Sequence, residues 1–149
     1  MTTVTRTATI RWLTHPPEGS PRLSVGSKSI TALPLSVDRE ADEPLAASPI
    51  ELLAGAIGSI FATFVSDALV KGSTQASELV IDVTLTMSVE GEDPVLTGLA
   101  CNLLARVARI DHEQLDAVAR TAIARCIAVL NMRAEAITVS IETQLEAQS

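Results

Sequence analysis

The stretch SPIELLAGAIGSIF, residues 48–61, decides the fold of this chain. It begins with the signals of a helix N-terminus, since Ser48 can act as the N-cap and Pro49 occupies the first helical position, where its missing N–H costs nothing. Glu51 stands where it completes a capping box. We expect the helix to run to about Leu69, with stop signals at residues 71 and 72. The chain is therefore predicted to contain one long helix.

This helix carries no charge on any face between Glu51 and Asp67. A helix that is apolar all round must be enclosed all round. A chain of 149 residues has few elements with which to surround a helix about 30 Å long. We therefore expect a homodimer, in which a second subunit completes the burial of the helix.

Composition limits the class of protein. The chain is 47% hydrophobic and 19% charged, with one Trp, two Phe and no Tyr, so its core must be built from aliphatic side chains. The formal net charge of −7 opposes binding to a phosphate backbone, and the scarcity of aromatic side chains leaves little for stacking on bases. These features exclude nucleic acid as a partner.

The sequence also predicts where the protein works. The N-terminus shows no apolar signal segment, and the apolar run 52–65 is shorter than the ~20 residues that cross a bilayer. Cys101 and Cys126 lie far apart without a C-x-x-C spacing, so neither a zinc site nor a redox dithiol motif is indicated. We expect a cytoplasmic protein with no membrane association, no metal and no cofactor.

Hydrophobic periodicity outlines the other elements. Alternation of polar and apolar residues predicts strands, and spacing by three and four predicts a second helix with Asp111 as its N-cap and Gln114 at N3. The predicted strands cover residues 4–12, 22–25, 29–35, 79–89, 99–107 and 137–145. The order β-β-β-α-β-β-α-β indicates an α+β protein whose helices cover antiparallel sheets. One domain over 1–149 is expected, with strands and a loop in 1–47 and the main body in 48–149.

Several sequence segments of this chain follow one another in the order and spacing of a known protein family. SPIELLAGA at 48–56 opens the long helix, and VLTGL at 95–99 enters a strand that ends in ARV at 105–107. An Asp-initiated helix follows, with Cys126 near its end and ITV at 137–139 in the last strand. In order and spacing this resembles the OsmC/Ohr family of organic hydroperoxide reductases, whose helix start reads S/N-P-x-E-L-L-A-A-A. The resemblance implies an OsmC-like intertwined homodimer with central buried helices and a role in oxidative stress.

The family reduces peroxides with two cysteines. A peroxidatic thiolate on the central helix attacks the O–O bond and becomes a sulfenic acid, which a second cysteine on the later helix resolves. Carried onto this sequence, the peroxidatic position in GSIF, residues 58–61, is Ile60. Cys126 matches the resolving cysteine, although Ile127 replaces the proline that commonly follows it. A branched hydrocarbon cannot attack a peroxide.

The family also uses an arginine and a glutamate beside the peroxidatic thiol. The glutamate that usually follows the proline is Ile50 in this chain, and Glu51 next to it points about 100° away around the helix. The arginine has three candidates, Arg11, Arg22 and Arg39. One member of the core catalytic set, Cys126, is therefore matched.

These departures predict a protein without the two-cysteine peroxidase cycle. The former active site, near Ile50, Ile60, Phe61 and Cys126, is expected to form an apolar pocket between subunits, which either binds a small hydrophobic molecule or serves packing alone. The alternative is a one-cysteine hydroperoxide reductase that uses Cys126 and is reduced again by an external thiol. The sequence leaves open whether the protein is an enzyme.

Small residues and a second cysteine have structural interpretations. Gly55, Gly58 and Ser59 are interpreted as allowing close approach of two helices at the dimer axis, with a ligand cavity as the alternative. Cys101, on the apolar face of a predicted strand, is expected to be an inert core residue.

Overall fold

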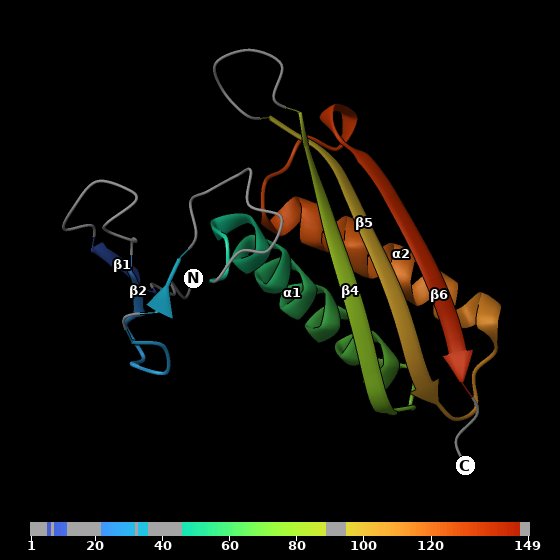
Figure 1. Ribbon diagram of the computed structural model, residues 1–149. Helices are drawn as coiled ribbons and strands as arrows, with labels where there is room; N and C mark the ends of the chain where they lie inside the picture. The colour runs from blue at the N-terminus through green and yellow to red at the C-terminus, as the bar shows by residue number, and fades with distance from the viewer. Residues whose placement is uncertain are drawn as a thin grey trace, which may run out of the picture. The chain divides into compact units, whose positions relative to one another are not determined.

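The computed structural model describes residues 6, 8–11, 22–31, 33–35, 46–88 and 95–146 (Figure 1). The chain divides into two compact units, Met1–Leu52 and Leu53–Ser149. The expectation of one domain over the whole chain stays a prediction.

The first unit contains a three-stranded antiparallel sheet in the order β1-β2-β3. Its strands are Ala8–Arg11 (β1), Arg22–Val25 (β2) and Leu33–Pro34 (β3). The third strand is shorter than the predicted 29–35, because residues 26–30 form a turn and a bend in which Lys28 has a φ of 61°. The ends of the predicted strand 4–12 and the loop 38–44 lie outside the described residues.

Helix α1, Pro49–Lys71, begins as its sequence predicts. The Ser48 backbone N–H donates to Glu51 Oε2 at 2.6 Å, and the Glu51 N–H donates to Ser48 Oγ at 3.1 Å, which confirms the capping box. At the other end, Ser73 adopts a φ of 61° and the Thr74 N–H donates to the carbonyl of Leu69 at 3.0 Å. This is a Schellman motif whose left-handed residue is Ser73, one position beyond the predicted stop signals.

The second unit contains a sheet of three strands in the order β4-β5-β6. They are Ala76–Ser88 (β4), Val95–Val107 (β5) and Thr138–Glu146 (β6). Strands β4 and β5 form the predicted antiparallel hairpin, whereas β5 and β6 run parallel. The sheet is therefore mixed and not antiparallel throughout, because the crossover through α2 returns the chain to the end of the sheet from which β5 starts.

Helix α2, His112–Val129, makes this crossover together with the one-turn 3₁₀ helix η1, Ala134–Ala136. The N–H of Gln114 donates to Asp111 Oδ1 at 2.8 Å, and the N–H of Asp111 donates to Gln114 Oε1 at 2.9 Å. Asn131, with a φ of 52°, follows the last turn. The predicted start of this helix at Asp111 is confirmed, as is the order of helices and strands.

The core of the second unit lies between its sheet and the two helices, which cover one face of the sheet (Figure 1). The inward side chains of β5 are wholly buried: Leu99, Cys101, Leu103, Ala105 and Val107. The opposite face is mostly polar, and there Arg106 contacts Glu78 and Glu146 at 2.7 Å each. One face of the sheet therefore supports the helices that carry the candidate site.

Candidate functional site

Ile60 occupies a position beside the buried stripe of α1. That stripe is formed by Ile57, Phe61, Val65 and Leu69, none more than 2% exposed. Ile60 is half-buried and packs against the same core. The side chain at the matched peroxidatic position therefore serves as packing, and its hydrocarbon supplies no nucleophile.

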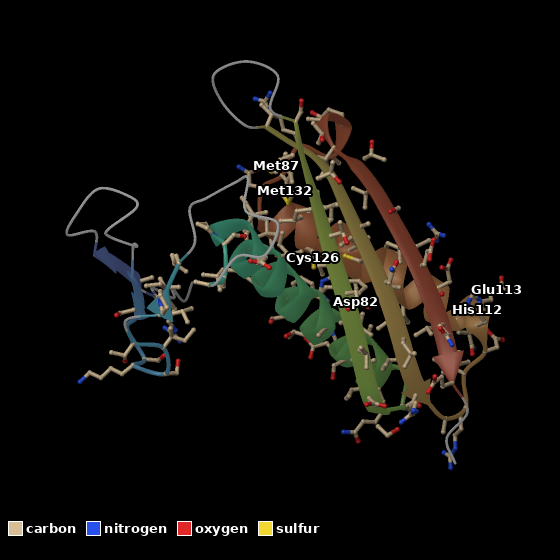
Figure 2. The ribbon with its side chains drawn as sticks, viewed as in Figure 1. Asp82, Met87, His112, Glu113, Cys126 and Met132 are labelled. Carbon is tan, nitrogen blue, oxygen red and sulfur yellow. The ribbon has the colours of Figure 1, made fainter. Side chains whose placement is uncertain are left out.

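Cys126 lies in the last turns of α2 (Figure 2). It belongs to the buried stripe of this helix, which also contains Leu115, Ala119, Ala122 and Ile123. The residue is 0% exposed and its thiol is free. Burial raises the pKa of Cys126, because an apolar environment disfavours the thiolate. Near neutral pH this sulfur is held as a thiol, which is a poor nucleophile.

Cys101 is a neighbour of Cys126 in the fold. The sequence contained no sign that these two cysteines lie close together. It lies at the centre of the sheet, paired with Val83 on β4 and Ile141 on β6, and is also 0% exposed. Burial raises the pKa of Cys101 to about 11, and the charge of the Cys126 thiolate adds to that rise. The inward alternation of β5 indicated a core cysteine, but the packing of α2 on this strand is a tertiary feature with no signal in the spacing.

Arg125 adds a charge that the sequence reasoning also missed. Its guanidinium carbon lies 4.0 Å from the centre of the Phe64 ring, so a cation–π contact joins α2 to α1. The positive charge of Arg125 acts on Cys126 in the direction opposite to burial, lowering the thiol pKa. Burial is the larger effect, and the net shift of the Cys126 pKa is upward.

The other matched positions lie at the start of α1 or in the first unit. Ile50 is exposed in the first helical turn, at 38%. Glu51 serves the helix cap, and hydrogen bonds from the backbone and side chain of Ser48 lower the pKa of its carboxyl group. Among the three candidate arginines, Arg11 lies in β1 and Arg22 in β2, while Arg39 is outside the described residues.

The remaining surface of α1 is open, and between Glu51 and Asp67 it carries apolar and hydroxyl side chains but no charge. Leu53 is 43% exposed and Val70 is 58% exposed. Ser59 Oγ donates to the carbonyl of Gly55 at 2.8 Å, and Thr63 Oγ1 donates to the carbonyl of Ser59 at 2.9 Å. Within the described residues the expected enclosure on all sides is therefore not achieved, and one stripe of the helix is buried. In the part of the chain described, α1 is also the one helix long and apolar enough to cross a membrane.

No group of three or more His, Cys, Asp or Glu side chains that could hold a metal ion occurs among the described residues. The chemistry available around Cys126 is therefore that of two buried thiols, an arginine and an apolar surround.

The sequence and the fold of this chain are similar to those of known proteins. Residues 41–142 match the family described as OsmC-like protein. The solved structure of an organic hydroperoxide resistance protein OsmC from Legionella pneumophila has a TM-score of 0.72 at 15% identity, over 97% of this chain and 99% of that one. An OsmC-like protein of unknown function from Vibrio cholerae gives a TM-score of 0.74 at 12% identity, over 95% of this chain and 100% of that one.

The organic hydroperoxide resistance protein OhrB of Bacillus subtilis is also similar, with a TM-score of 0.68 at 14% identity, over 95% of this chain and 98% of that one. No curated protein gives a significant match in sequence. At these identities the structural likeness establishes the α+β fold.

Proposed function

Because the chain belongs to the OsmC-like protein family, we propose that it takes part in the response to oxidative stress as a cytoplasmic homodimer that lacks a two-cysteine peroxidase cycle. Two of its structural relatives are named as organic hydroperoxide resistance proteins, which supports this setting. The family assigns the general role, and the side chains of this chain argue for the loss of the cycle.

The observation that carries the proposal is Ile60 at the matched nucleophile position. No sulfur is available there to attack a peroxide, and the remaining matched residue, Cys126, is wholly buried with a raised pKa. A buried thiol that keeps its proton at neutral pH reacts slowly with peroxides. We infer that the space near Ile50, Ile60, Phe61 and Cys126 forms an apolar pocket in the dimer that receives a small hydrophobic molecule.

The open face of α1 supports pairing with a second copy. The hydroxyls of Ser59 and Thr63 are both satisfied within their own helix, so the part of this face around them can lie against apolar side chains without leaving these donors unpaired. Exposed Leu53 and Val70 lie along the same helix. Two such helices together would remove apolar surface that one chain leaves in water.

Sedimentation equilibrium of paired variants tests the homodimer. Thr63→Arg places a charge on the open face of α1, and the matched Thr84→Arg places the same charge on the polar face of the sheet. We expect the first variant to dissociate and the second to stay dimeric. A wild-type protein that is monomeric at micromolar concentration would refute the pairing, and a requirement for detergent would instead favour a membrane-bound α1.

One observation favours a second candidate function, a one-cysteine hydroperoxide reductase. The Arg125 charge lowers the pKa of the Cys126 thiol against the effect of burial. In that reaction the Cys126 thiolate attacks one peroxide oxygen, the O–O bond breaks and an alcohol leaves. The resulting sulfenic acid is reduced by two equivalents of an external thiol, which yield a disulfide and water.

Intact mass after treatment with tert-butyl hydroperoxide separates the two functions. A gain of one oxygen on Cys126 at stoichiometric peroxide would support the one-cysteine enzyme. An unchanged mass, together with thiols that react only after unfolding, would support the protein without peroxidase activity. Cys126→Ala serves as the control for oxidation elsewhere in the chain.

A further inference from the structure

We draw no further inference here: the strongest candidate, the uncharged open face of helix α1 around Ser59 and Thr63, belongs to the pairing with a second copy already proposed, and nothing in the described residues shows what else would cover it.

Discussion

Gly58 of α1 lies directly against Val83 of β4. A Cβ placed on the glycine would be 3.1 Å from Val83 Cγ2, which is closer than side chains normally pack. The small residue thus serves a contact between the helix and the sheet of its own chain. This finding corrects the interpretation of Gly58 as a residue of the dimer axis, whereas Gly55 has nothing within 4 Å and stays available for such a role.

The Gly58–Val83 contact predicts a coupled effect on stability. Gly58→Ala gains about 1 kcal/mol from helix propensity but overpacks the contact at a cost of roughly 1–3 kcal/mol. We expect a small net loss of stability in urea unfolding. In a Val83→Ala background the same substitution should become stabilising, since the opposing methyl group is gone. Additive effects of the two substitutions would contradict the contact.

The capping box of α1 predicts a dependence on acid pH. Because hydrogen bonds from Ser48 lower the Glu51 pKa from its ordinary 4.5, the carboxylate stabilises the fold above that value, and this contribution is lost as pH falls through the lowered pKa. In Glu51→Gln the free energy of unfolding should therefore fall less steeply as pH decreases below 4.5. Ser48→Ala should return the Glu51 pKa, measured by NMR, toward its ordinary value and cost about 1 kcal/mol of stability. An unmoved Glu51 pKa in Ser48→Ala would contradict the box.

The Cys101 thiol predicts an alkaline limit to stability. Its pKa rises from 9.0 to about 11 on folding, so the unfolded chain releases this proton first as pH increases. Stability is fully present below pH 9 and falls between pH 9 and about 11, by roughly 3 kcal/mol for this group. Urea unfolding of wild type and Cys101→Ala across that range measures the effect. Parallel pH profiles of the two proteins would show that Cys101 ionises as it does in the unfolded chain.

The position of Ile60 predicts a crosslink. Ile60→Cys should place a thiol that faces Cys126 across the packing of α1 and α2, and mild oxidation should then form a disulfide within the chain. Intact mass under non-reducing conditions, with peptide mapping, detects it. Ser59→Cys is the matched control, since Ser59 is exposed on the open face of the helix. Failure of Ile60→Cys to crosslink would mean that the match of residues 58–61 to the family is out of register.

Much of this fold could be predicted from the chain because its signals are local. Capping residues such as Ser48 and Asp111 fix the starts of both helices, and alternation along β5 fixes which side chains enter the core. Such features depend on residues a few positions apart, so they are readable from spacing alone. The likeness to the OsmC-like family and the absence of sulfur at position 60 also follow from the sequence.

Tertiary structure decided four relationships that the sequence did not indicate. They are the parallel pairing of β5 with β6, the contact of Gly58 with Val83, the closeness of Cys101 to Cys126 and the stack of Arg125 on Phe64. Each joins segments that are far apart in the chain, and their separation depends on how whole helices pack on the sheet. The sequence by itself therefore determined which elements form and which chemistry position 60 lacks. Tertiary packing alone placed Arg125 against Phe64 and Cys101 near Cys126, because these neighbours come from other elements, which periodicity does not reveal.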